Sequence, residues 1–355
     1  MGRRRQAVTI KHVAADAGVS LQTVSRVINN ESGVRPEMKR RVQEAIDRLH
    51  YVPSIAAQRM SGSRSYLILA VNDRDRTIAD WRSREGADWV DQMLLGGMTT
   101  AAAAGYRLML ELVDTHSDHV ERELRSTIAA LQPDGVILTP PHSDNPLITN
   151  LLAEQQISFA RIGSKETDAG LSLLMDEEGA AALATRHLLE LGHRRIGFIA
   201  GSPEYPLSGW RVDGWRQAMT EAGCADETLL AQGDFSYASG EQAARRLLSG
   251  KDAPTAVIAS NDQMALATLA VAKQRGLVVP RDLSLISFDN TPVVRFVQPP
   301  LTAVDQPIAR ISASAVELIV ADQRRSARPQ APLVIEAELV TRGSTAVATH
   351  RNSTA

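Results

Sequence analysis

A chain of 355 residues is longer than one hydrophobic core usually serves, so about two or three domains are expected. Hydrophobic residues make up 44% and charged residues 23%, which is typical of a folded globular protein. There is no long apolar run, and the polar segment after Met1 differs from a secretory signal. The single cysteine, Cys224, excludes an internal disulfide, and no Cys/His cluster has zinc-ligand spacing. We therefore expect a cytoplasmic protein with no membrane segment and with neither metal nor other cofactor.

The net charge of −2 hides a difference between the start of the chain and the rest. Residues 1–64 contain 12 Lys and Arg against 5 Asp and Glu, a charge of +7, so the remainder carries −9. A basic head on an acidic body suggests a polyanion partner for the head alone. A solvated basic terminus would give the same count, so the residue pattern has to decide.

Three short helices are predicted in the head. Thr9 is a good N-cap for a helix over residues 10–17, where apolar residues recur at helical spacing, and Gly18 supplies the stop. Ser20 caps a second helix, and a third runs from Pro36 to residue 49. Two helices joined by a Gly-containing turn form a helix-turn-helix.

The exposed side of the second helix carries groups that can bond to DNA. Gln22 can pair with adenine and Arg26 can reach guanine in the major groove, while hydroxyl and amide side chains suit phosphates. Any small three-helix domain also has polar exposed positions, so DNA contact by this helix is an interpretation of the pattern. The candidates for DNA contact in the head are Thr9, Ser20, Leu21, Gln22, Thr23, Ser25, Arg26 and Asn29.

Residues 9–20 and 23–29 resemble the head of the LacI/GalR repressor family, and residues 51–60 are similar to its hinge helix. The resemblance implies that Ala57 and Met60 reach the minor groove and that Met60, usually Leu in the family, wedges into the central base step. The segment after Pro53 is too short to be a stable isolated helix, so its folding can be coupled to DNA binding. The alternative is that Met60 packs against the body of the protein.

After a linker that ends at residue 64, strand-like runs alternate with helical patterns, which predicts parallel sheets covered by helices on both faces. The number of strands favours two lobes. The fold class is therefore α/β, with an all-α three-helix head. The predicted strands are 67–71, 106–112, 135–138, 157–162, 196–200, 256–259 and 283–288, and the predicted helices are 90–104, 120–131, 179–191, 211–222, 240–248 and 263–275.

Polar residues follow several of these strands, at the edge where ligands bind in such folds. They can hold a ligand that is dense in hydroxyl groups, but Asp and Asn at strand ends can equally cap the next helix. These pairs are Asn72–Asp73, His142–Ser143, Asn261–Asp262 and Asp289–Asn290.

Residues 191–199, 208–214, 259–265, 287–290 and 300–306 are similar to landmarks of the LacI/GalR effector domain, a two-lobed periplasmic-binding-protein-like fold. The resemblance extends over residues 9–343. It implies an effector site that includes Arg211, Phe235, Asn261 and Asp289, and in some members of the family the position of Gln306; the strand-end position adds Asp73.

The resemblance also implies a domain plan in which the chain crosses between the lobes three times. The head spans residues 1–50, the hinge and linker 51–64, and the effector domain 65–343. Lobe one comprises about 65–163 plus 291–323, and lobe two about 164–290 plus 324–343. A polar tail, 344–355, lacks a leucine heptad, which argues against a coiled-coil tetramer.

The likeness fails over residues 74–93, which exceed the usual family segment by about a dozen residues and which we call the inserted segment. It holds Trp81 and Trp89, whose faces could serve as platforms for sugar rings. Burial of both indoles against the first lobe is the alternative.

The resemblance implies a homodimeric repressor that binds double-stranded operator DNA and is released from a pseudo-palindromic site by a small effector, which the polar and aromatic residues of the predicted site suggest is sugar-like. A corepressor-dependent repressor or an activator, responding to a nucleoside or another small metabolite, is the alternative. An enzyme is disfavoured because the usual nucleotide-binding, nucleophile and zinc motifs are missing from the sequence. A solute-binding protein of a transporter would share the fold but not the basic head.

Overall fold

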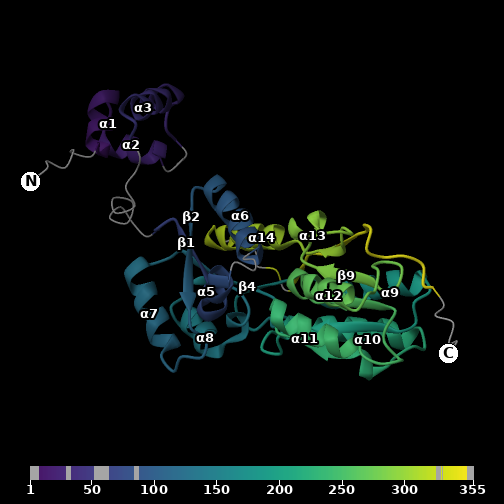
Figure 1. Ribbon diagram of the computed structural model, residues 1–355. Helices are drawn as coiled ribbons and strands as arrows, with labels where there is room; N and C mark the ends of the chain where they lie inside the picture. Colours follow the sequence, from purple (N-terminus) through teal and green to yellow (C-terminus); the bar gives the residue numbers. More distant parts are fainter. Residues whose placement is uncertain are drawn as a thin grey trace, which may run out of the picture. The chain divides into compact units, whose positions relative to one another are not determined.

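The computed structural model describes residues 8–28, 33–51, 64–83, 88–324, 329 and 331–349. They divide into two compact units between Tyr66 and Leu67, whose elements are shown in Figure 1. The first unit is helical and the second is α/β, so the predicted fold class is confirmed. In the described part of the chain, no helix is long and apolar enough to cross a membrane.

Three helices surround a small core in the head. Helix α1 (Ile10–Ala17) ends at Gly18, whose φ of 62° lies in the left-handed region that glycine tolerates best. Helix α2 (Leu21–Ile28) follows Ser20, whose Oγ accepts a hydrogen bond from the Thr23 amide at 3.1 Å. Helix α3 (Pro36–Leu49) completes the core, to which Tyr51 also contributes. The predicted helix-turn-helix is present, and Tyr51 extends the core past the predicted boundary at residue 50.

The first lobe is built from the following elements: β1 (Leu67–Asp73), α5 (Arg74–Ser83), α6 (Asp88–Ala103), β2 (Arg107–Val113), α7 (Val120–Leu131), β3 (Gly135–Leu138), η1 (His142–Asp144), α8 (Pro146–Glu154), β4 (Ser158–Ile162), β5 (Leu171–Leu174), α14 (Ile308–Gln323) and β11 (Leu333–Val334). Its sheet has the order β11-β5-β4-β3-β1-β2, and all neighbouring strands are parallel. Helices α7 and α8 cover one face, and α6 packs with α14 on the other (Figure 1). Both faces of a parallel sheet are thereby buried.

The second lobe repeats this plan with α9 (Glu177–Glu190), β6 (Ile196–Ala200), α10 (Pro206–Glu221), η2 (Glu227–Leu229), β7 (Leu230–Gln232), α11 (Tyr237–Leu247), β8 (Ala256–Ala259), α12 (Asp262–Gln274), β9 (Ser284–Phe288), α13 (Val293–Phe296), β10 (Thr302–Asp305) and β12 (Glu338–Val340). The order is β12-β10-β9-β8-β6-β7, with only β12 antiparallel. Successive residues of a strand face opposite sides, so Phe198 packs with α9 and α10 while Ile199 packs with α11 and α12.

Sheet membership corrects the predicted lobe boundaries. Strands β5 and β11 belong to the first-lobe sheet, although the predicted boundaries place both in lobe two. Strand β10 belongs to the second-lobe sheet, although the predicted boundaries place it in lobe one. The three crossings therefore lie between β5 and α9, between β10 and α14, and between β11 and β12. Strands β5 and β10 include polar residues and β11 has only two residues, so none of them forms the continuous apolar run that identifies a buried strand in the sequence.

The predicted polar tail is partly packed on the second lobe. Ser344 is fully buried, and its hydroxyl accepts a hydrogen bond from the Thr302 amide at 2.7 Å. The carbonyl of Ala346 accepts a hydrogen bond from His193, and the amide of Ala348 bonds to Leu191. Residues 344–349 are thus structural, because polar side chains there satisfy buried backbone groups that a solvated tail would leave exposed.

Candidate functional site

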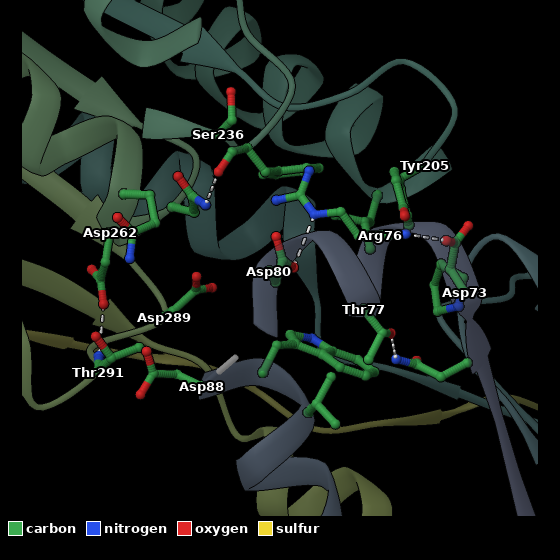
Figure 2. A pocket seen from close by; sticks show the side chains of 18 of the residues that line it. Asp73, Arg76, Thr77, Asp80, Asp88, Tyr205, Ser236, Asp262, Asp289 and Thr291 are labelled. Atoms are coloured by element: carbon green, nitrogen blue, oxygen red, sulfur yellow. Dashed lines mark hydrogen bonds and ion pairs between the residues drawn. The ribbon is translucent and has the colours of Figure 1, made fainter. Parts of the chain in front are cut away.

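The two lobes enclose a cavity of about 160 Å³ at the carboxyl ends of their central strands (Figure 2). This is where ligands bind in parallel α/β folds. The first lobe contributes polar residues and an indole from the end of β1 and from α5 and α6, namely Asn72, Asp73, Arg76, Thr77, Asp80, Asp88 and Trp89. The second lobe contributes Tyr205, Arg211, Phe235, Asn261, Asp262, Asp289 and Thr291, among others.

Asn261 joins two parts of the second-lobe wall. Its Oδ1 caps α12 by accepting the Met264 amide at 2.9 Å, and its Nδ2 donates to the carbonyl of Phe235 at 2.7 Å. Phe235 has a φ of 73°, a strained conformation for an aromatic residue. The amide of Asn261 therefore helps to hold the Phe235 ring in the cavity wall.

Arg211, on α10, is held in place by contacts within the second lobe. Its Nε donates to Glu177 Oε2 at 2.7 Å, its guanidinium donates to the carbonyl of Ser260, and its Cζ lies 4.7 Å from the centre of the Phe288 ring. Gln306 donates to the same Oε2 at 2.8 Å and does not line the cavity. An effector contact by Gln306 therefore stays a prediction, and in this structure its bond to Glu177 makes it a positioning residue for Arg211.

Three carboxylates from both lobes lie at one end of the cavity, where Figure 2 shows Asp88, Asp262 and Asp289 near Thr291; we call them the acid cluster. Burial raises the pKa of Asp262 to about 6. Burial and the neighbouring charge of Asp262 raise the pKa of Asp289 to about 7, and burial also raises the pKa of Asp88. Asp289 has a φ of 85°, a left-handed conformation that Asp and Asn adopt more readily than most residues.

The inserted segment forms the opposite wall. Its first part is α5, which starts directly after β1 and is capped by Asp73, whose Oδ1 accepts the Arg76 amide at 2.7 Å. Asn72 anchors the same helix by donating to Thr77 Oγ1 at 2.8 Å. Asp73 thus caps a helix and lines the cavity at once, which are the two roles that the strand-end pattern left open.

Arg76 connects the lobes. Its Nε pairs with Asp80 at 3.0 Å on the same helix, and its Nη1 donates to the carbonyl of Asp234 in the second lobe at 2.7 Å. The guanidinium carbon also lies 6.0 Å from the centre of the Phe235 ring. These contacts bring α5 against the second lobe across the cavity.

The two tryptophans of the inserted segment differ. Trp89, at the start of α6, lines the cavity, whereas Trp81 on α5 is 45% exposed and does not. Trp89 is therefore placed to contact a ligand in this cavity, while a platform role for Trp81 stays a prediction without a position in the cavity lining. Trp81 lies on the solvent-facing side of α5. The sequence of this helix has no clear helical period, so the orientation of Trp81 could not be predicted from it.

Most of the polar residues predicted at the ends of strands line the cavity, but not all of them do. His142 and Ser143 follow β3 yet are buried in the first lobe and do not line the cavity, and Ser143 donates to the carbonyl of Ile162 at 2.6 Å. Sequence reasoning did not select Arg76, Thr77 or Asp80. A usable signal existed, because these three follow Asp73 at helical spacings of three, four and seven residues.

In the head, the predicted DNA-contact residues are mainly on α2 and its cap. Leu21 and Gln22 are exposed, Thr23, Ser25 and Arg26 are partly buried, and Thr9 and Ser20 sit at the starts of α1 and α2. The hydroxyls of Ser20 and Thr23 lie 2.9 Å apart. Three further candidates, Asn29, Ala57 and Met60, lie outside the described residues.

Known proteins resemble this chain over nearly its whole length. Residues 9–54 match the family model of bacterial regulatory proteins of the lacI family, and residues 185–345 match that of a periplasmic binding protein-like domain. The transcriptional repressor CytR of Escherichia coli is 33% identical, over 97% of this chain and 98% of that protein.

Solved structures agree with these matches. A complex of the transcriptional regulator CelR with cellobiose is 31% identical, with a TM-score of 0.70 over 95% of this chain and 99% of that one. A Lac repressor dimer bound to operator and an anti-inducer is 26% identical, with a TM-score of 0.78 over 96% and 100% of the two chains. The head with its helix-turn-helix and the two-lobed domain with its enclosed cavity therefore have a common explanation: the chain belongs to the LacI family of DNA-binding transcription regulators.

Proposed function

We propose that this regulator is a repressor of carbohydrate-catabolism genes that leaves a pseudo-palindromic operator when a small sugar-like effector enters the cavity. The cavity carries the proposal, because it combines carboxylates, an amide and a guanidinium from both lobes with the indole of Trp89 and the ring of Phe235. Polar acceptors and donors fix hydroxyl groups, and aromatic faces cover the apolar faces of sugar rings. Binding that joins both lobes favours their closed arrangement, and this gives the effector a means of changing the DNA-bound state.

A homodimer is the form proposed to bind DNA, with the effector domains meeting along α6 and α14. Leu95 and Met98, one turn apart on α6, are 55% and 51% exposed. A Cβ on Gly96 would come within 1.8 Å of the Ala309 carbonyl oxygen, so α6 and α14 form one closely packed surface. An exposed apolar strip on such a surface suits a second copy of the chain. The relevant neighbour, the Lac repressor, is a dimer on its operator.

The DNA-binding proposal is tested by a gel shift at fixed salt on the DNA upstream of the protein's own gene. We expect specific retardation, and we expect Gln22→Ala or Arg26→Ala to weaken specific binding by about 1–3 kcal/mol. Gln43→Ala, an exposed residue on α3, is the matched control and should retain binding. Absence of specific retardation at every salt concentration would disprove the proposal.

The effector is tested by repeating the gel shift with a panel of sugars and nucleosides. Relief of retardation by one sugar supports induction by a carbohydrate. Retardation that appears only when a small molecule is added would instead support the corepressor alternative, and relief by a nucleoside alone would replace the carbohydrate with that class.

A further inference from the structure

The charges that line the cavity are unbalanced. Both guanidinium groups are already paired, Arg76 with Asp80 at 3.0 Å and Arg211 with Glu177 at 2.7 Å. Asp73 is engaged in capping α5. Within the described residues, the acid cluster of Asp88, Asp262 and Asp289 therefore has no ion-pair partner.

The acid cluster spans the cleft between the lobes. Asp88 comes from α6 of the first lobe, Asp262 from the start of α12, and Asp289 from the end of β9 in the second lobe. Figure 2 shows the three at the same end of the cavity, away from Asp73 and Tyr205. Their proximity is also visible in their electrostatics, since the charges of Asp88 and Asp262 both raise the pKa of Asp289.

Asp262 gives an independent indication of a missing partner. Its side chain is only 3% exposed, and its Oδ2 accepts the Thr291 amide at 2.7 Å. Its Oδ1 is buried and receives no hydrogen bond of ordinary length within the described residues, although the nearby hydroxyls of Ser287 and Thr291 lower the pKa of this carboxyl. A buried carboxylate oxygen without a donor costs free energy, which a ligand donor in the cavity would recover.

A positively charged donor satisfies this arrangement best. A phosphate or carboxylate on the ligand would be repelled by the acid cluster, and a neutral hydroxyl would supply a hydrogen bond while leaving the like charges uncompensated. We propose that the acid cluster receives a protonated amine, so that the effector is an aminated sugar or another hydroxylated amine. This inference rests on the proposed sugar-like effector site and specifies its chemistry.

The proposal links ligand charge to closure of the lobes. In the ligand-free protein, Asp88 on one lobe faces Asp262 and Asp289 on the other, and ionised carboxylates at these positions repel each other. An ammonium group between them attracts both sides at once. Trp89, adjacent to Asp88, lines the cavity where it can contact the carbon skeleton of the same ligand.

Loss of protons from the acid cluster gives amine binding a characteristic pH dependence. Several charged groups act on the members of the cluster. The charges of Asp262, Arg211, Glu177 and Asp88 act on Asp289, and those of Asp88 and Arg342 act on Asp262. The charge of Asp91, on the same helix, acts on Asp88. Because the pKa values of Asp262 and Asp289 are raised to about 6 and about 7, amine affinity should rise from about pH 5 to about pH 7 as they ionise, and it should fall at higher pH as the sugar amine itself loses its proton. The affinity of the uncharged parent sugar should not follow this rise.

The test compares glucose and galactose with glucosamine and galactosamine and with the two N-acetylated sugars. Binding to the full-length protein is measured by isothermal titration calorimetry up to millimolar concentrations, in buffers free of primary amines. We expect each amine that binds to bind about tenfold or more tightly than its neutral parent and its N-acetylated form. Asp88→Asn should bring this ratio toward one, whereas Asp75→Asn, on α5 outside the cavity and with a 76% exposed side chain, should keep it.

The outcomes separate this inference from the proposed function. A neutral sugar that binds as well as its amine, or a panel in which no amine binds, overturns the amine proposal. The wild-type ratio decides this even when Asp88→Asn fails to fold, which its melting curve reveals. If a neutral sugar binds and also releases operator DNA, the proposed function stands without the amine; if no operator binding exists, the proposed function fails by itself.

Discussion

The second-lobe wall of the cavity is part of the lobe's own core, whereas the first-lobe wall is an added helix and the start of another. Arg211, Asn261 and Asp289 come from elements that also hold the sheet together, and Arg211 is almost fully buried. Arg76 and Trp89 come from the inserted segment, whose helix α5 is attached through its cap and a few polar contacts. The difference implies that substitutions in the second-lobe wall change stability and ligand response together, while those in the inserted segment change the response with little effect on stability.

The largest expected effect is on Arg211. Replacing it by Met leaves Glu177 buried without its cation, so the free energy of unfolding should fall by about 3–5 kcal/mol in urea denaturation followed by circular dichroism. Arg216→Met is the control on the same helix, because its side chain is 41% exposed and its pairs with Glu227 and Asp213 should contribute under about 1 kcal/mol. Adding Glu177→Gln to Arg211→Met should recover part of the loss. Equal losses from the two arginines would contradict a structural role for the second-lobe wall.

Arg76 tests the other wall. Its removal breaks the contact with the Asp234 carbonyl across the cavity but no core packing, so global stability should change by less than about 1 kcal/mol. Amide hydrogen exchange should instead rise by about threefold to tenfold in α5 and in residues 232–236 of the ligand-free protein. Arg82→Ala, an exposed residue in the last turn of the same helix, should leave exchange unchanged. Should Arg76→Ala lower global stability as much as Arg211→Met, the two walls would not differ as described.

The same difference explains what could be predicted from the sequence. Strands β3, β6 and β8 and helix α7 match their predicted bounds, because buried parallel strands are short apolar runs and α7 has a clear amphipathic period. The expectation that ligands bind at the carboxyl ends of parallel strands then pointed to Asn261 and Asp289, which line the cavity. Both conclusions depend only on local pattern and on the geometry of parallel sheets.

Other features depend on tertiary contacts that a local pattern does not encode. The sequence of helix α5 is so polar that it resembles a loop. Its cavity-facing residues can be recognised only when Asp73 is known to cap the helix. Gln306 is a position that the resemblance implied for the effector site. In the structure it bonds to Glu177, the partner of Arg211, and this bond joins segments 129 residues apart. Pairing of the short strands β5, β10 and β11 likewise arises from long-range contacts.

Asp289 is the residue where a carboxyl that suits ligand binding should most clearly lower the stability of the ligand-free protein. Its pKa is raised to about 7 in the folded protein, against about 3.9 in an unfolded chain, so the folded state holds the proton more tightly between these values. The stability from its protonated form is complete below about pH 4 and is lost as the pH rises to about 7. Asp289→Asn, which can keep the left-handed backbone, should therefore raise the melting temperature at pH 8 by about 2–4 °C, and by less at pH 5.

The control for this prediction is Asp75→Asn, since Asp75 is exposed on α5 and its replacement should give no pH-dependent change. A wild-type melting temperature above that of Asp289→Asn at pH 8 would show that ionised Asp289 is compensated in the absence of ligand. In that case the acid cluster would be satisfied by the protein itself.

The smallest expected effect concerns the two tryptophans of the inserted segment. With a sugar of the panel that binds, Trp89→Phe should remove most of the change in tryptophan fluorescence, because Trp89 lines the cavity. Trp81→Phe should retain it, because the Trp81 side chain is 45% exposed and lies outside the cavity lining. Both variants keep an aromatic ring, so stability should change by less than about 1 kcal/mol. A signal lost with Trp81 and kept with Trp89 would mean that the ligand is read on the outer side of α5, and the first-lobe wall would then act through movement of that helix and not by contact.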